Sequence, residues 1–212
     1  MNDFLSFVVE EQDLIIRAAL QHMYISLLAV TIGSLIAIPT GIWLTRNKSI
    51  ANYILGVTGV VQTIPSLVLL GMALIIFGLG TTPALIVLSL YSILPILRNT
   101  YTGISEVDDM YIEAAKGMGM TGVQILLQVE IPLALSVIIA GVRISLVYII
   151  SWATLAALIG AGGLGDLIWT GLASYDKNMI FAGAIPASIL ALVVGTVIGI
   201  IQKLATPKGL RK

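Results

Sequence analysis

Four long stretches of apolar residues constrain the fold of this chain more than any other feature of its sequence. A helix that rises about 1.5 Å per residue needs roughly 20 apolar residues to cross the hydrocarbon layer of a membrane. Charged or turn-forming residues bound each of the four stretches, which are Met23 to Leu44, Ile54 to Phe77, Leu133 to Ile159 and Met179 to Ile201. We expect each stretch to form one membrane-spanning helix.

A fifth, shorter apolar stretch runs from Pro83 to Leu97 and ends at Arg98. It follows the turn-forming segment Gly78 to Thr82, so a helix extended by a turn would reach the length of a span. The composition agrees with a chain whose main solvent is lipid, because 58% of the 212 residues are hydrophobic and 10% are charged. The sequence therefore predicts an all-α, polytopic membrane protein with about five transmembrane helices.

The basic residues near the ends of the spans indicate the orientation of the chain. Lys and Arg are retained on the cytoplasmic side of a membrane, and most of them here follow the first, third and fifth spans. This group consists of Arg46, Lys48, Arg98, Lys116, Lys203, Lys208, Arg211 and Lys212. Arg17 and Lys177 fall on the other side, among six acidic residues. We therefore expect the N-terminus outside the cell and the C-terminus in the cytoplasm.

These assignments divide the chain into three parts. Residues 1–19 mix apolar positions with charges and predict an external interfacial helix, with a disordered tail as the alternative. Residues 20–203 form the expected transmembrane domain, and residues 204–212 form a basic cytoplasmic tail. Within the domain, residues 102–132 form the longest non-spanning segment, which the orientation places in the cytoplasm.

Groups suited to catalysis are absent from the expected spans. Charged side chains at depth are costly enough to imply a role, and only Arg143 lies there, with no carboxylate in any span to pair with it. We interpret Arg143 as a structural residue whose long side chain reaches the cytoplasmic interface. The chain also has no cysteine and one histidine, His22. The sequence thus predicts no catalytic residue and no metal site, and it argues against an intramembrane enzyme and a proton-coupled transporter.

The segment Gly160 to Gly165 has the spacing G-x-G-x-x-G, which binds dinucleotides when it follows a strand in a βαβ unit. Here it follows a long apolar helix, so we interpret it as a sharp turn that lets helices approach closely. A phosphate-binding loop of the form G-x-x-x-x-G-K-[ST] is also missing from the sequence. If ATP drives this protein, another chain must bind it.

The non-spanning segment begins with signals for a short helix. Asp108 or Asp109 can cap its N-terminus, where an acidic group is also favoured by the helix dipole. The helix should run through Met118, with Gly117 and Gly119 ending it. The sequence therefore predicts one short helix in the first half of this segment.

A second helix should follow directly. Thr121 and Gln124 have the spacing of a capping box, so we expect a helix from Gly122 to Glu130. Pro132 then bends the start of the fourth span. Together the two helices predict a helix-turn-helix elbow on the membrane face, available to contact a partner.

The elbow carries a motif. Its residues reproduce the spacing E-A-A-x-x-x-G, followed after nine residues by I-x-L-P. The first part is Glu113-Ala114-Ala115 with Gly119, and the second part is Val129-Glu130-Ile131-Pro132. This resembles the coupling loop of permease subunits in bacterial ATP-binding cassette importers, with Val129 and Ile131 as conservative departures. The resemblance implies that the elbow docks in a cleft of a separate ATPase subunit. Its coupling residues would be Glu113, Ala114, Ala115, Gly119, Val129, Ile131 and Pro132.

Further segments narrow the resemblance. Three segments look most similar to those of osmoprotectant permeases for glycine betaine, carnitine and choline. They are Gln62 to Leu67, Tyr91 to Tyr101 and Ile159 to Ile168. Methionine-type permeases share the five-span plan. The resemblance implies a protein of the bacterial plasma membrane that works with an ATPase subunit, an extracellular binding protein and a second permease, identical or paralogous. It implies no cofactor on this chain, with ATP bound by the partner, and the formal net charge of zero gives no reason to expect nucleic acid.

The path of the solute is less defined by the sequence. A quaternary ammonium group is held best against aromatic faces, and Tyr91, Tyr148 and Trp152 are the candidates within the spans. Core packing or anchoring at the membrane interface remains an alternative for each of them. Two other functions also stay open, which are an importer permease for an amino acid such as methionine and a self-contained channel or structural membrane protein.

Overall fold

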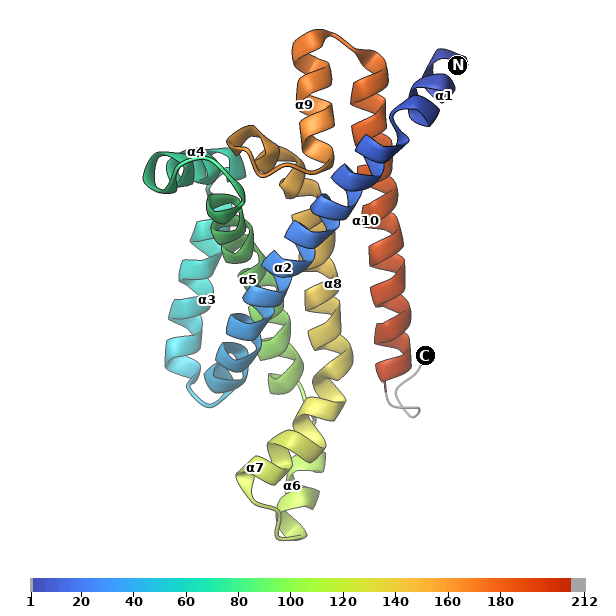
Figure 1. The fold of residues 1–212 in the computed structure, drawn as a ribbon. Coiled ribbons are helices and arrows are strands. Elements are labelled where there is room, and N and C mark those ends of the chain that lie inside the picture. Colours follow the sequence, from blue (N-terminus) through green and yellow to red (C-terminus); the bar gives the residue numbers. More distant parts are fainter. Residues whose placement is uncertain (1, 207–212) are drawn as a thin grey trace.

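The computed structural model describes residues 2–206, with side chains from Phe4 onward, and all regular elements in this part of the chain are helices. Most of the predicted basic tail, residues 207–212, lies outside the described residues. The predicted all-α class is confirmed. In Figure 1 the long helices stand side by side, and a short helical elbow projects below them.

Four helices are long and apolar enough to cross a membrane. They are α2 (Gln12–Thr45), α5 (Thr81–Ser105), the α8 region (α8 itself, Ile131–Ala156, within the continuous helical stretch Gly122–Ile159) and α10 (Lys177–Ala205). The short apolar stretch that begins at Pro83 belongs to α5, which has 25 residues. The helix gains this length because the flanking polar residues continue it at both ends, as the prediction of an extended span required.

The second apolar stretch is not the single helix that we predicted. It is divided into α3 (Lys48–Thr63) and α4 (Ser66–Phe77), which meet at an angle of 89°. Ile64 is extended, with φ −70° and ψ 128°, because the ring of Pro65 disfavours a helical conformation in the residue before it. Pro65 also has no N–H to continue the ladder. The pair α3–α4 is therefore a broken span or a re-entrant loop.

The N-terminal segment is helical as well. The helix α1 (Asn2–Glu10) precedes α2, and the rings of Phe4 and Phe181 meet edge to face with centroids 6.2 Å apart. The boundary predicted at residue 19 falls inside α2, which already begins at Gln12. Its first turns are held there because Ala18 packs into a small apolar cluster with residues of the C-terminal half of the chain.

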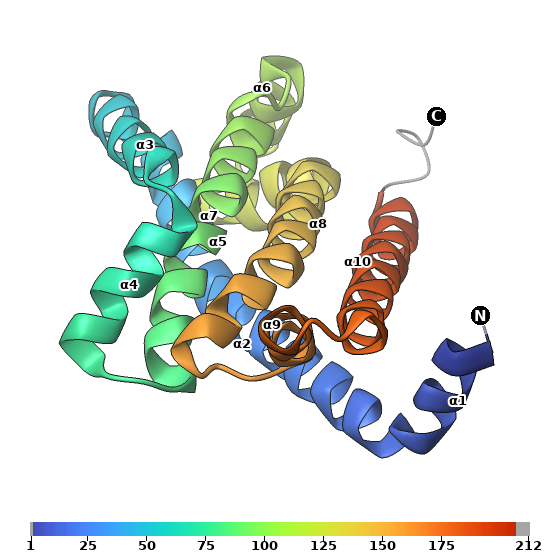
Figure 2. The ribbon, with the colours of Figure 1, turned by 90° about the horizontal axis from the view of Figure 1, so that it is seen from above.

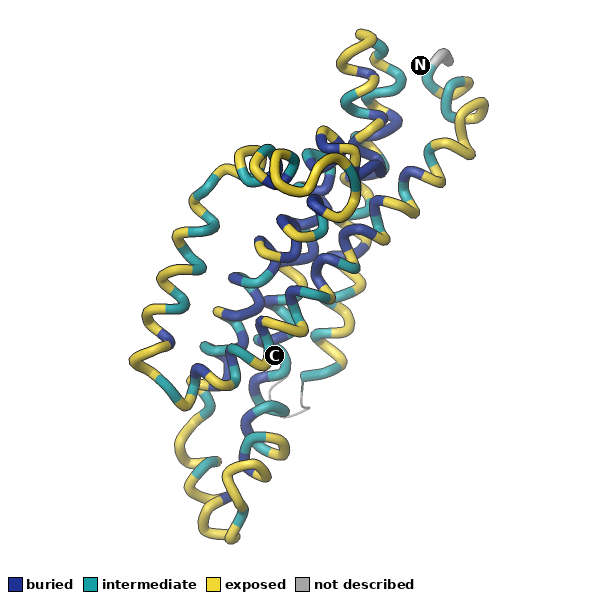
Figure 3. Tube along the Cα trace, turned by 60° about the vertical axis from the view of Figure 1, so that its left-hand side comes forward, coloured by how far each residue is buried: buried dark blue, intermediate teal, exposed yellow. Residues whose placement is uncertain are grey.

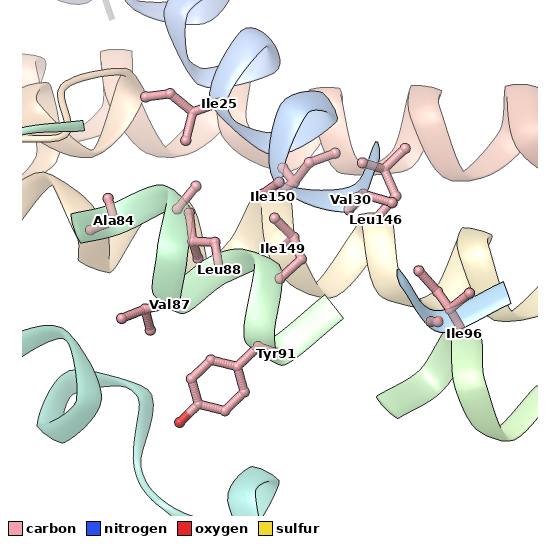
Figure 4. Packing of buried hydrophobic residues seen from close by; sticks show 14 of the residues in the cluster. Ile25, Val30, Ala84, Val87, Leu88, Tyr91, Ile96, Leu146, Ile149 and Ile150 are labelled. Carbon is pink, nitrogen blue, oxygen red and sulfur yellow. The ribbon is translucent and has the colours of Figure 1, made fainter. Parts of the chain in front are cut away.

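The core lies where α2, α5 and α8 cross, and Figure 4 shows its apolar side chains. Buried positions run through the centre of the bundle, whereas exposed ones dominate the elbow (Figure 3). Small residues let the helices approach closely: a Cβ on Gly141 of α8 would lie 2.9 Å from the carbonyl oxygen of Pro95. Hydroxyl groups also link the helices, since Ser145 Oγ donates to the carbonyl oxygen of Ser92 at 3.1 Å.

A glycine turn connects α8 to a helix that we did not predict, α9 (Leu164–Ser174). Gly160, Gly162 and Gly163 have φ of 77°, 80° and 83°, so the turn needs residues without a side chain. The side chain of Gln21 in α2 holds the turn by donating to the carbonyl oxygen of Ala161 at 3.1 Å and accepting from the N–H of Gly163 at 3.3 Å. The turn therefore packs against the N-terminal part of α2.

Arg143 lies on the exposed side of α8 and faces α10. A Cβ on Gly199 would lie 3.1 Å from its guanidinium, so the missing side chain of Gly199 leaves room for it. Within residues 4–206 Arg143 forms no ion pair. The structural role of Arg143 stays a prediction.

Candidate functional site

The first elbow helix is α6 (Asp109–Gly117). The carboxylate of Asp108 caps it by accepting a hydrogen bond from the N–H of Met110 at 2.9 Å. Lys116 lies in the last turn, where a cation interacts favourably with the helix dipole. The predicted helix is thus confirmed, and its C-terminus differs from the prediction by one residue.

A turn centred on Gly119 ends this helix. The N–H of Gly119 donates to the carbonyl of Lys116 at 2.9 Å, and the N–H of Met120 donates to the carbonyl of Ala115 at 3.1 Å. These two bonds form a Schellman motif, which places Gly119 in the left-handed region at φ 78°. A Cβ on Gly119 would meet no atom within 4 Å. Gly119 is therefore required for its backbone conformation, not to leave space for a neighbour.

The predicted capping box at Thr121 and Gln124 is present, with the N–H of Thr121 donating to Gln124 Oε1 at 2.8 Å. It starts α7 (Gly122–Ile125), but the second elbow helix does not end at Glu130 as predicted. A π-helical turn, η1 (Leu126–Glu130), continues it directly into α8. The backbone hydrogen bonds change from the α-helical to the wider π-helical pattern just before Pro132. Pro132 has no N–H, and its ring would clash with a regular α-helical turn.

The residues of the motif fall into two groups in the elbow. Glu113, Ala114 and Gly119 are exposed on its outer surface. Ala115 is buried and Val129, Ile131 and Pro132 are half-buried, so these four residues pack within the elbow and at its junction with α8. The same outer surface carries exposed apolar side chains, namely Met110, Tyr111, Met118, Val123 and Leu127. A projecting surface of this kind is suited to docking into a groove of a partner protein.

An ion pair that the sequence analysis missed lies between the elbow and the bundle. Arg46, directly after α2, donates through Nη1 to Glu130 Oε1 at 3.0 Å, and its Nη2 contacts Oε2. Both residues line an open hollow of about 620 Å³, whose other lining residues belong to the elbow. Glu130 occupies a variable position of the motif, and Arg46 is 84 residues away, so only the opposite charges could have indicated the pair.

The three aromatic residues proposed for the solute path form one row. The ring centroids of Tyr91 and Trp152 are 4.8 Å apart, and those of Trp152 and Tyr148 are 5.8 Å apart. Tyr91 on α5 is buried, Trp152 on α8 is half-buried and Tyr148 is 50% exposed. The row therefore leads from the core to an exposed face of α8. In Figure 2, α3 and α4 lie on one side of α5 and α8, and α10 lies on the other.

Tyr91 also joins α5 to the break between α3 and α4. Its hydroxyl donates to the carbonyl oxygen of Ile64 in the break, and its ring points toward that segment in Figure 4. In return, Gln62 Nε2 donates to the carbonyl oxygen of Tyr91 at 3.1 Å. A regular helix would supply this carbonyl with the N–H of residue 95, but Pro95 has none. Each segment thus satisfies a carbonyl group that the other leaves without a helical partner.

We expect Tyr91→Phe to lower the free energy of unfolding by about 1–3 kcal/mol, because the half-buried carbonyl of Ile64 then loses its donor. Thermal unfolding of the purified protein in detergent would measure the change. Tyr148→Phe is the matched control, since the half-exposed Tyr148 hydroxyl makes no hydrogen bond within the described residues. Equal melting temperatures for the two variants would contradict the clamping role of Tyr91.

No group of three or more His, Asp or Glu side chains that could hold a metal ion occurs in the described part of the chain. The candidate site consists of the elbow, the Arg46–Glu130 pair and the aromatic row. It thus has an exposed elbow at one end of the molecule and a row of aromatic residues that begins in the core of the bundle.

Comparison with known proteins agrees with this description. Over its full length the chain is 49% identical to the carnitine transport permease protein OpuCB of Listeria monocytogenes, covering 97% of that protein. It is also 45% identical to the glycine betaine/carnitine/choline transport system permease protein OpuCB of Bacillus subtilis, covering all of this chain and 97% of the relative.

The fold has a counterpart among solved structures. A chain of the MetNI methionine ABC transporter, in an inward-facing crystal form, superposes with a TM-score of 0.84 at 21% identity, covering 93% of this chain and 99% of that one. Residues 29–209 match the family described as binding-protein-dependent transport system inner membrane component. The chain therefore belongs to this family, the membrane-embedded permease subunits of ABC importers.

Proposed function

We propose that the elbow is the surface through which this permease subunit binds the ATPase subunit of its importer. The proposal rests on the exposed surface formed by Glu113, Ala114 and Gly119 with the neighbouring apolar side chains. The elbow projects from the bundle, so it can enter a cleft of a partner (Figure 1). ATP is bound by that partner and not by this chain, and hydrolysis there moves the elbow and, through it, the spans.

The remaining partners follow from the same assignment. We infer that two permease chains, identical or paralogous, enclose the path, and that an extracellular protein delivers the solute. The N-terminus and the elbow lie at opposite ends of the molecule in Figure 1. With the elbow at the ATPase, we infer that the N-terminus lies outside the cell and the end of α10 in the cytoplasm, an orientation that the distribution of basic residues supports.

The solute that we propose is a quaternary ammonium osmoprotectant, namely glycine betaine, carnitine or choline. The single observation that carries this proposal is the identity of 49% and 45% to permeases named for these solutes. The row Tyr91–Trp152–Tyr148 supports it, because stacked aromatic faces attract such a cation without needing a hydrogen bond. The solved methionine transporter shares the fold at 21% identity, so it supports methionine less than these relatives support an osmoprotectant.

The test is uptake into liposomes that contain the permease with its ATPase and binding protein. We expect ATP-dependent accumulation of radiolabelled choline, carnitine or glycine betaine and none of methionine. Replacing Tyr148 by Leu removes an aromatic face from the row and should lower the rate by about 2- to 30-fold. Tyr148→Phe keeps the face and should stay close to the wild-type rate.

Each other outcome points to a defined alternative. Uptake of methionine alone would contradict the osmoprotectant assignment and leave the importer intact. Solute flux without ATP would instead favour a self-contained channel. Equal rates for Tyr148→Leu and Tyr148→Phe would remove Tyr148 from the path and make it a packing residue.

A further inference from the structure

The pair Arg46–Glu130 has the geometry of a fixed mechanical contact. Two nitrogen atoms of one planar guanidinium face two oxygen atoms of one carboxylate, with Nη1 donating to Oε1 at 3.0 Å. Such a two-point arrangement sets the orientation of both groups as well as their separation. It is the one ion pair within residues 4–206.

The two partners differ in burial, which indicates how strongly the pair is needed. The side chain of Glu130 is 3% exposed, whereas that of Arg46 is 50% exposed. A buried carboxylate is costly unless it is paired, and both oxygens of Glu130 are engaged by Arg46. The half-exposed arginine keeps part of its hydration while it makes this contact. Glu130 therefore depends on Arg46 more than Arg46 depends on Glu130.

The pair joins the end of α2 to the junction between the elbow and α8. Arg46 caps the C-terminus of α2 and stands in the short turn before α3. Glu130 is the last residue of the π-helical turn that leads from α7 into α8. A π-turn departs from the regular hydrogen-bond ladder of an α-helix, and a contact at its end helps to fix how the elbow is oriented relative to the bundle.

We propose that Arg46 and Glu130 are positioning residues that transmit the movement of the elbow to the turn between α2 and α3. The inference rests on the proposed docking of the elbow to the ATPase. In that complex α8 receives the movement directly through the continuous helix, and the ion pair carries it to the end of α2 and the turn before α3. The pair thus makes α2, α3 and α8 respond together to the ATPase.

The experiment uses the complete importer in liposomes and the variants Arg46→Gln, Arg46→Lys and Glu130→Gln. The main readout is solute taken up per ATP hydrolysed. We expect this ratio to fall by about 5- to 150-fold in Arg46→Gln and in Glu130→Gln. Arg46→Lys keeps the charge but loses the second point of contact. Its uptake per ATP hydrolysed should lie between the values of these two variants and the wild type. The matched control is Arg98→Gln. Arg98 is an exposed arginine of α5 that forms no ion pair within the described residues.

Two further measurements separate transmission from folding. The exchanged pair, Arg46→Glu with Glu130→Arg, should recover part of the lost ratio. Spin labels at Asn47 and Gln128 should keep one narrow distance through the ATPase cycle in the wild type, and the distribution should broaden in Arg46→Gln.

The outcomes that overturn the proposal are distinct from those that overturn the elbow's docking. Unchanged uptake per ATP in both Gln variants would exclude transmission through the pair. Loss of assembly in every variant, with no recovery on exchange, would make the pair a folding contact. An elbow that does not bind the ATPase in the wild-type complex would instead refute the docking on which the inference rests.

Discussion

Gly119→Val is expected to abolish most ATP-driven uptake while the spans stay folded. Gly119 has φ 78°, and its N–H and that of Met120 close the turn that separates the two elbow helices. A β-branched residue in this conformation costs roughly 1–3 kcal/mol. The turn would then open, the outer surface of the elbow would change shape, and we expect uptake to fall about tenfold or more, since 1.4 kcal/mol corresponds to a factor of ten.

Gly119→Asn is the matched control, because asparagine adopts the left-handed region at much lower cost. No atom lies within 4 Å of a Cβ at this position, so the larger side chain meets no obstacle within the chain. Uptake near the wild-type rate for Asn and its loss for Val would assign the effect to the backbone conformation. Similar losses for both would show instead that the ATPase packs against residue 119 itself.

Gly165→Ala is expected to destabilise the whole membrane domain. A Cβ there would lie 2.4 Å from the carbonyl oxygen of Thr154 and 2.7 Å from the Cβ of Ala157. These atoms belong to the backbone and to a short side chain, so neither can rotate away. Overpacking of this kind costs about 1–3 kcal/mol or more, and we expect the melting temperature in detergent to fall by roughly 3–10 °C.

Gly71→Ala gives the comparison for this change. Gly71 lies inside α4, and a Cβ on it would meet no atom within 4 Å. Replacing a helical glycine by alanine where there is room stabilises a protein by about 0.4–1 kcal/mol. The two variants should therefore shift the melting temperature in opposite directions. Equal shifts would mean that α9 moves aside to accept a methyl group and that the contact between α8 and α9 is loose.

The membrane helices could be predicted from the sequence because each depends on a run of neighbouring residues. The break at Pro65 was missed, although its signal was present, since a long apolar run outweighed one proline and its effect on Ile64. The helix α9 was missed because its residues follow a cluster of glycines and its apolar stretch is too short to span. Length and mean hydropathy therefore identified the long apolar helices better than the short helices and the break.

The candidate site shows the same division between local and distant interactions. The cap at Asp108, the capping box at Thr121 and the glycine turn involve residues close together in sequence, and the structure has all three. The pair Arg46–Glu130 joins residues 84 positions apart, and the contact of Tyr91 with Ile64 joins residues 27 apart. Such contacts depend on how the helices cross, which the pattern of a single sequence does not specify.

The uninterrupted helical stretch Gly122–Ile159 connects the elbow to the opposite end of the bundle as one rod. With 38 residues it is about 57 Å long. A tilt of about 5° at the elbow would displace the far end by about 5 Å if the rod stayed rigid over this length. That end carries the glycine turn held by Gln21. If the ATPase docks on the elbow as we propose, a small rotation there is sufficient to strain the contact that closes the turn against α2 at the opposite end of this helical stretch.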